Sequence, residues 1–163
     1  MPIELKGSCH CGAVKYSVQS STPVPYQLCC CSICRKVGGY AGAVNLGADY
    51  ETLKIEGEEN ITKYQAVKDR GTKEEEKCTS FRSFCSKCSS MLWLWDPTWP
   101  ELVHPFASSV DEPELKVPHE MTCLMLGSKP AWVPLPEGKK KLFDVYPTTT
   151  IESWHKAHGE FIP

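Results

Sequence analysis

The segment Gln27-Leu28-Cys29-Cys30-Cys31-Ser32-Ile33-Cys34-Arg35-Lys36 holds four thiols within six residues. Such a density of thiols is typical of a metal site and unusual for a hydrophobic core. If the segment begins as a strand, side chains alternate across it, so Cys29 and Cys31 share one face and Cys30 points away. Cys34 follows in a tight turn that can bring it back toward that pair. The segment therefore predicts three ligands for a zinc, and a three-ligand zinc with one open position is typical of a catalytic site.

Four further cysteines supply the ligands of a second predicted site. Cys9-x-Cys11 lies in the turn of a predicted hairpin, and Cys85-x-x-Cys88 forms a knuckle that begins 74 residues after Cys11. Together they are enough to close a structural zinc that ties the hairpin to a later sheet. A competing assignment joins Cys31-x-x-Cys34 to Cys85-x-x-Cys88 as a zinc ribbon. We prefer the first assignment because it uses seven cysteines in two sites, whereas the second leaves three spare thiols beside a metal.

The remaining cysteines could change this division if one of them closed the three-ligand site. Cys30, Cys78 or a histidine would then make both sites structural. Strand geometry turns Cys30 away from its neighbours, and we expect Cys78 and Cys123 to be buried small hydrophobic residues. His10 lies between two ligand cysteines, but its position is more typical of an exposed turn residue.

Length and charge set limits on the class of protein. The 163 residues fit one domain spanning 1–163, with room for a substantial core. The net charge of −2 and the pI near 6.2 give no basic field, so neither nucleic acid nor an anionic membrane is an expected partner. The first residues lack the apolar core of a signal peptide, which favours a cytoplasmic location. Cysteines in that compartment stay reduced, so the ten in this chain indicate metal ligands before disulfides.

Patterning predicts a mainly β, single-domain fold with short helices. Leu5–Val18 is typical of a hairpin, and a helical turn at Ser32–Val37 should stop at the following glycines. Lys68–Lys77 is charged and predicts a solvated loop. Thr149 and Glu152 form a predicted capping box for a last helix. Further strands are expected at Tyr40–Leu46, Thr52–Glu56, Ile61–Val67, Cys78–Phe84 and Met91–Trp95.

Several motifs resemble those of the glutathione-dependent formaldehyde-activating enzyme family. They are Gly7–Val14, Cys29-x-Cys31-x-x-Cys34-Arg35-Lys36 and Phe84-Cys85-x-x-Cys88, followed in the same order by Asp96-Pro97, Ala107–Asp111 and Ser128–Trp132. The resemblance covers residues 3–134 and leaves 135–163 as a C-terminal extension. It implies a β-rich, Mss4-like fold with two Zn²⁺ per chain. The structural zinc would lie on Cys9, Cys11, Cys85 and Cys88, and the catalytic zinc on Cys29, Cys31 and Cys34.

The implied reaction is the reversible addition of glutathione, or a related thiol, to formaldehyde or another small aldehyde. This is a carbon–sulfur lyase activity of the S-(hydroxymethyl)glutathione synthase type. Three thiolates around Zn²⁺ carry a formal charge of −1, which favours binding of an incoming thiol over hydrolysis. Candidate cations for the carboxylates of glutathione are Arg35 and Lys36 beside Cys34, and Arg82 and Lys87 near the knuckle.

Two other classes of function stay open at this point. A non-catalytic two-zinc binding module or thiol carrier would need both metals but no open position. A thiol redox enzyme would need Cys30 or Cys78 to be exposed, with a lowered pKa. The sequence also departs from the family pattern, with Cys30 where histidine is common and Ser89 where glycine is common, and such departures bear on the identity of the substrate more than on the fold.

Overall fold

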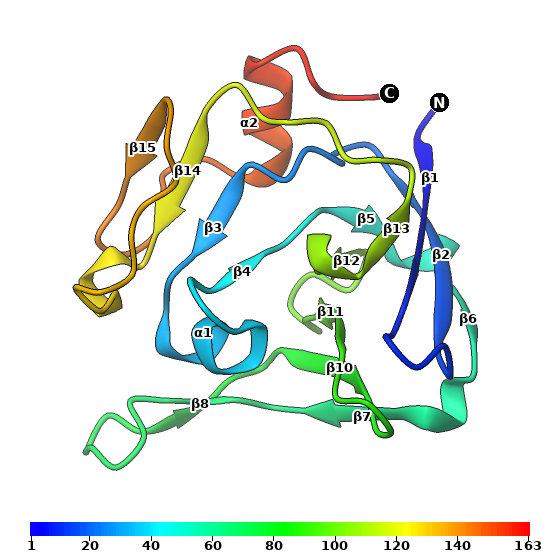
Figure 1. The fold of residues 1–163 in the computed structure, drawn as a ribbon, viewed down its shortest axis with the longest axis horizontal. Helices are drawn as coiled ribbons and strands as arrows, with labels where there is room; N and C mark the ends of the chain where they lie inside the picture. The colour runs from blue at the N-terminus through cyan, green and yellow to red at the C-terminus, as the bar shows by residue number, and fades with distance from the viewer.

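A computed structural model describes all residues, 1–163, as fifteen short strands and two α-helices joined by turns and 3-10 segments. The strands form three larger sheets and one two-stranded hairpin (Figure 1). The expectation of a mainly β single domain with short helices is confirmed. Neither helix, at seven residues each, is long and apolar enough to span a bilayer.

The first sheet is built on the predicted N-terminal hairpin. Leu5 lies opposite Val18 across the two hairpin strands, and alternate residues of both strands are buried. Gly7 packs against the ring of Tyr16 and the carbonyl of Ser109, where a side chain would not fit. The antiparallel strand order is β13 (Val110–Glu112), β1 (Ile3–Ser8), β2 (Lys15–Ser20) and β6 (Lys54–Glu56).

The second sheet shares the main hydrophobic core with the first. Tyr16 of the first sheet meets Trp93 of the second edge-to-face, with ring centroids 5.3 Å apart. Leu5, Val18 and Leu92 are among the fully buried residues around this contact. The antiparallel strand order is β5 (Ala48–Asp49), β12 (Leu102–Pro105), β11 (Met91–Trp95), β10 (Phe81–Cys85) and β7 (Ile61–Tyr64).

The third sheet holds the cysteine-rich segment and contains the parallel pairings of the fold. Its strand order is β15 (Lys140–Leu142), β14 (Met121–Leu124), β3 (Gln27–Cys29) and β4 (Ala43–Val44). β14 runs parallel to both β15 and β3, and Leu124 lies opposite Cys29. Helix α1 (Ser32–Gly38) follows β3 directly and matches the predicted helical turn.

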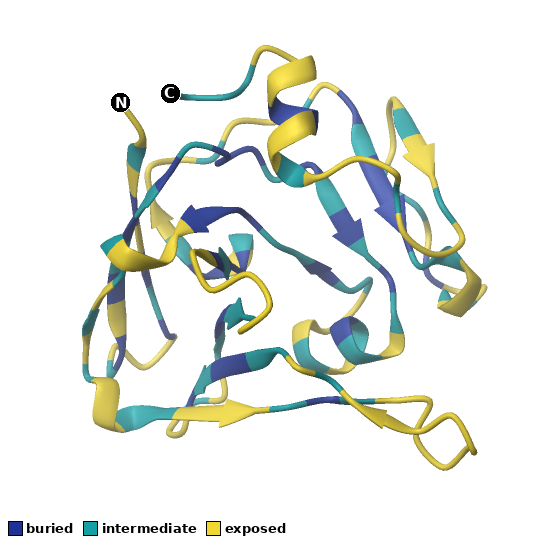
Figure 2. Cartoon of the chain, turned by 180° about the vertical axis from the view of Figure 1, so that it is seen from behind, coloured by how far each residue is buried: buried dark blue, intermediate teal, exposed yellow.

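The structure shortens several predicted elements. The strand expected at Tyr40–Leu46 is reduced to β4, because Gly42 has φ +139° and packs its backbone against the carbonyl of Cys29. The strand expected at Ile61–Val67 divides into β7 and the start of a hairpin. That hairpin, β8 (Val67–Lys68) with β9 (Glu76–Lys77), encloses the predicted solvated loop, which Figure 2 shows as exposed.

The last helix, α2 (Ile151–Ala157), begins one residue later than predicted. Thr150, and not Thr149, is the N-cap, and Ser153, and not Glu152, completes the capping box. The helix is held on the core by Trp154, whose ring stacks on Tyr26 with centroids 3.8 Å apart. This tertiary contact anchors the helix, and the local capping box of Thr150 and Ser153 marks its start.

Candidate metal centres

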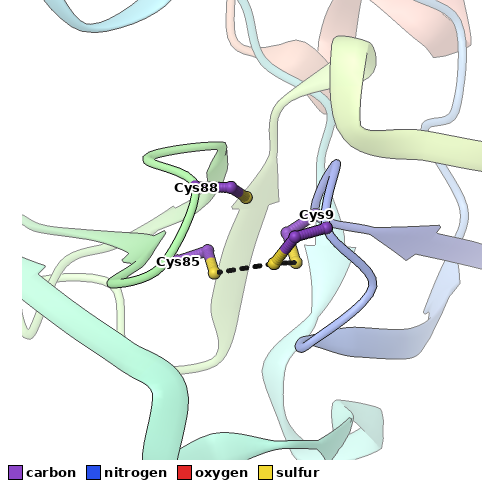
Figure 3. A group of neighbouring side chains, drawn as sticks. Cys9, Cys85 and Cys88 are labelled. Carbon is purple, nitrogen blue, oxygen red and sulfur yellow. Dashed lines mark hydrogen bonds between the residues drawn. The ribbon is translucent and has the colours of Figure 1, made fainter.

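The four-thiol group consists of Cys9, Cys11, Cys85 and Cys88. Figure 3 shows Cys9, from the turn of the β1–β2 hairpin, facing Cys85 at the end of β10 and Cys88 in the turn that follows. The sulfurs of Cys9 and Cys11 are 3.6 Å apart, and those of Cys11 and Cys85 are 3.8 Å apart. Four sulfurs at about 2.3 Å from a tetrahedral Zn²⁺ would be about 3.8 Å from one another. A disulfide needs about 2.05 Å, so the spacing fits a metal and excludes a bridge.

Backbone donors point at the sulfurs of this group. The N–H of Val14 donates to Cys9 Sγ at 3.2 Å, and the N–H of Lys87 donates to Cys85 Sγ at 3.4 Å. The hydroxyl of Ser90 lies 3.2 Å from Cys88 Sγ and lowers the pKa of that thiol to about 5. Donors of this kind stabilise ionised sulfur, the form that binds metal. The four residues predicted from spacing are therefore assembled with their supporting shell.

The three-thiol group consists of Cys29, Cys31 and Cys34, and their sulfurs lie within 4.8 Å of one another. Cys29 ends β3, Cys31 is the N-cap of α1, and Cys34 lies in the first turn of that helix. The N–H of Cys34 donates to Cys31 Sγ at 3.3 Å, which fixes the turn that returns Cys34 to the pair. Cys31 thus reaches the group as a helix cap and not as a strand residue, although the predicted set of three sulfurs is assembled.

The electrostatics of the three-thiol group favour an ionised sulfur. Hydrogen bonds from the thiols of Cys29 and Cys34 lower the pKa of Cys31 to about 2. The hydrogen bond to Cys31 raises the pKa of Cys29, since its thiol is the donor in that pair. Cys34 is buried, whereas Cys29 and Cys31 keep some exposure. The group therefore offers a metal soft sulfur ligands, part of whose surface faces solvent.

Arg82 of β10 reaches the three-thiol group and not the knuckle. It is only 6% exposed, and its Nη2 lies 3.8 Å from Cys34 Sγ. The hydrogen bond with Cys29 and, more weakly, the positive charge of Arg82 lower the pKa of Cys34, but the hydrogen bond with Cys31 and burial outweigh them and raise it. Arg82 is near the knuckle in the sequence, but its polar contact is with the three-thiol group. The contact joins residues 48 positions apart in the chain, so it cannot be read from the local sequence.

The other candidate cations do not face the thiols. Arg35 donates from Nε to the carbonyl of Cys30 and from Nη2 to the carbonyl of Ser128, both at 3.0 Å, so it joins two backbone segments. Lys36 and Lys87 are exposed.

The spare thiols stay outside both groups. Cys30 and Cys123 are fully buried, and burial raises the pKa of both. A buried, protonated thiol is a poor nucleophile, which argues against Cys30 as a redox centre. Cys78 is half-buried, and His10 is exposed, as expected for a turn residue. A large hollow of about 810 Å³, lined by residues that include Trp99, His104 and Glu152, contains no cysteine.

The spacing and supporting contacts of both groups can be compared with known proteins. Residues 4–123 match the family described as glutathione-dependent formaldehyde-activating enzyme. The chain belongs to this family. The matched range contains all seven cysteines of the two groups.

Two relatives extend the family match. A Halomonas elongata protein named "Putative glutathione-dependent formaldehyde-activating enzyme" is 47% identical over 157 residues, covering 95% of this chain and 96% of its own. The crystal structure of a Rhodobacter sphaeroides protein shares 29% identity with a TM-score of 0.51, covering 67% of this chain and 90% of that one. The first relative accounts for almost the whole chain, including residues beyond the family match.

Two residues of the sites were not assigned to them by sequence reasoning. Ser90 supports Cys88 and also accepts the N–H of His10 at 3.0 Å, so it connects the knuckle to the hairpin turn. The position of Ser90, two residues after Cys88, was the feature of the sequence that could have indicated this role. For Arg82, the signal was a charged residue in the otherwise uncharged segment Phe81-Arg82-Ser83-Phe84-Cys85.

Proposed function

We propose that this protein is a zinc-dependent carbon–sulfur lyase that adds glutathione, or a related thiol, reversibly to formaldehyde or another small aldehyde. The observation that carries the proposal is the difference in ligand number between the two groups. Four cysteines meet in one, whereas Cys29, Cys31 and Cys34 meet in the other without a fourth histidine, cysteine or carboxylate ligand. Membership of the family supports the same assignment.

We assign a structural zinc to the four-thiol group and a catalytic zinc to the three-thiol group, giving two per chain. The donor set fits, because soft sulfur ligands in tetrahedral spacing select zinc over harder cations. A Zn²⁺ held by three thiolates would supply one free coordination position and would favour the ionised form of a bound thiol. The protein's own residues then hold the three sulfurs rigidly through the cap of α1 and through the packing of Cys34 against Ala43 and Phe106.

The substrates follow from the chemistry of the site and from the family. The name of the Halomonas elongata relative mentions glutathione and formaldehyde. Ten unpaired cysteines need a reducing compartment, which supports a cytoplasmic location.

A cobalt-substituted sample tests the open position directly. Glutathione added to the Co²⁺ protein should change the thiolate-to-metal and ligand-field absorption bands, because a new sulfur enters the coordination shell. S-methylglutathione, which has no ionisable thiol, should bind much more weakly. Turnover is measured in parallel as faster S-hydroxymethylglutathione formation from glutathione and formaldehyde than in the uncatalysed mixture.

The outcomes separate the candidate functions. Equal binding of glutathione and its S-methyl derivative would show that the thiol is not recognised through the metal. Tighter binding of a different thiol would keep the reaction class and change the substrate. No spectral response to any thiol, together with no acceleration, would leave the chain as a two-metal scaffold without catalytic function.

A further inference from the structure

Arg82 is a buried cation without an ordinary anionic partner. Arg82 lies in β10 opposite Leu94 of β11 and Tyr64 of β7, and it is 6% exposed. No carboxylate lies within ion-pair distance of its guanidinium, and both Nε and Nη1 are buried without a hydrogen-bond partner. Its single polar contact is the one from Nη2 to Cys34 Sγ at 3.8 Å.

The surroundings of Arg82 make this isolation unfavourable. Leu94 belongs to the apolar cluster that also contains Cys34, Ala43 and Phe106. A guanidinium has five donors, and burial of its charge without a partner is strongly unfavourable. A buried arginine with one weak contact therefore indicates that a negative charge is present beside it in the working protein.

The three-thiol group can supply that charge. Three thiolates around a divalent ion carry a formal charge of −1, and Arg82 brings the sum to zero. An incoming thiolate would then take the sum to −1 with Arg82 and to −2 without it. The other arginine near this segment, Arg35, already donates to two backbone carbonyls.

We propose that Arg82 is the charge-balancing positioning residue of the three-thiol group, a role that rests on the proposed function of that group. It stabilises the ionised, metal-bound set of Cys29, Cys31 and Cys34, and it favours an anionic thiolate over a neutral molecule as the fourth ligand. Arg82 acts through Cys34 and does not itself need to touch the substrate.

The test compares Arg82→Met, Arg82→Lys and the control Arg70→Met, since Arg70 is exposed in the β8–β9 hairpin. Affinity for the second equivalent of Co²⁺ is measured by competition with a chelator. The variant Cys29→Ser should bind one equivalent only, and the equivalent that it loses is thereby assigned to the three-thiol group. Arg82→Met should lower the affinity for the second equivalent of Co²⁺ by about 10- to 100-fold, which is the usual effect of losing a residue that supports a metal ligand. Arg82→Lys should recover most of the affinity, and Arg70→Met should bind both equivalents as the unchanged protein does.

Thermal melting separates charge balance from ordinary packing. With one metal equivalent, Arg82→Met should melt at or above the temperature of the unchanged protein, because it removes an unpaired buried cation. With two metal equivalents, Arg82→Met should melt at a lower temperature than the unchanged protein. The proposal would be overturned by any of three results. These are an equal drop in melting temperature with one and with two equivalents, failure of Arg82→Met to fold with one equivalent, and unchanged affinity for the second equivalent.

Thiol binding to the Co²⁺ protein completes the experiment. Glutathione should bind Arg82→Met at least tenfold more weakly than it binds the unchanged protein, with partial recovery in Arg82→Lys. If the unchanged protein responds to no thiol, the proposed function fails. The metal-affinity and melting results still decide whether Arg82 balances the charge of the three-thiol group.

Discussion

The two cysteine groups differ in how far apart their ligands lie along the chain. Cys11 and Cys85 of the four-thiol group are 74 residues apart and join the turn of one hairpin to the turn of another. The three-thiol group is complete within the corner between β3 and α1. A metal that closes a long loop contributes to folding, whereas a metal on a local corner can be lost with less effect on the rest of the chain.

The groups also differ in how their charge is supported. Backbone N–H groups and the hydroxyl of Ser90 surround the four-thiol group. The three-thiol group has one helix-cap N–H and the buried guanidinium of Arg82. A complete ligand set needs neutral donors that hold it in place. An incomplete set that must accept an anionic ligand benefits from a full positive charge nearby.

The largest effect is expected for Cys85→Ser. Structural zinc binds with about 10–16 kcal/mol in small zinc domains, which is as large as the whole stability of a typical domain. The variant should therefore lose its near-ultraviolet circular dichroism at room temperature and bind less metal. Cys78→Ser is the control, because Cys78 is half-buried and outside both groups. A Cys85→Ser variant that melts like the control would show that the four-thiol group does not hold the fold together.

Cys29→Ser should have a selective effect. Metal content should fall from about two to about one per chain, while the fold and most of the melting temperature are kept. Metal analysis and a thermal melt on the same sample measure both quantities. If Cys29→Ser and Cys85→Ser unfold equally, the three-thiol group is structural, and the two groups do not differ in what they contribute to the fold.

Cys30→Ala tests the neighbour of Cys29 within the same segment. Cys30 is fully buried and not part of the group of three sulfurs. Its truncation should cost about 1 kcal/mol of unfolding free energy through a small cavity. Metal content should stay at about two per chain, as judged by metal analysis alongside a urea melt. Loss of one metal would instead bring Cys30 into the ligand set.

The smallest effect is expected from native-state alkylation. Metal binding should protect seven thiols, and burial should protect Cys30 and Cys123, which leaves Cys78 as the reactive one of the ten. Intact mass after brief iodoacetamide treatment should show one added group and little change in the melting temperature. Prior chelation should expose more sites. Modification of Cys29 or Cys31 before chelation would show that the three-thiol group is not metal-bound.

Much of the local structure could be predicted because it depends on short-range geometry. The hairpin β1–β2, the strand β11 and the helix α1 follow from alternation, turn residues and glycines near each segment. The capping box of α2 lies one residue later than predicted, at Thr150 and Ser153, and Trp154 of the same helix stacks on the distant Tyr26. Local patterns predict that an element exists better than they predict where it begins.

The sequence by itself favoured the division of seven cysteines into four and three over a zinc ribbon of Cys31, Cys34, Cys85 and Cys88, which its Cys-x-x-Cys spacings also allow. It also determined that Cys30 stays apart from its neighbours. Only the tertiary structure decided that Cys31 joins its group as a helix cap, that β3 pairs in parallel with β14, and that Arg82 lies against Cys34. These features depend on residues that are far apart in the chain, and their contacts are set by the packing of whole sheets and not by the identity of adjacent residues.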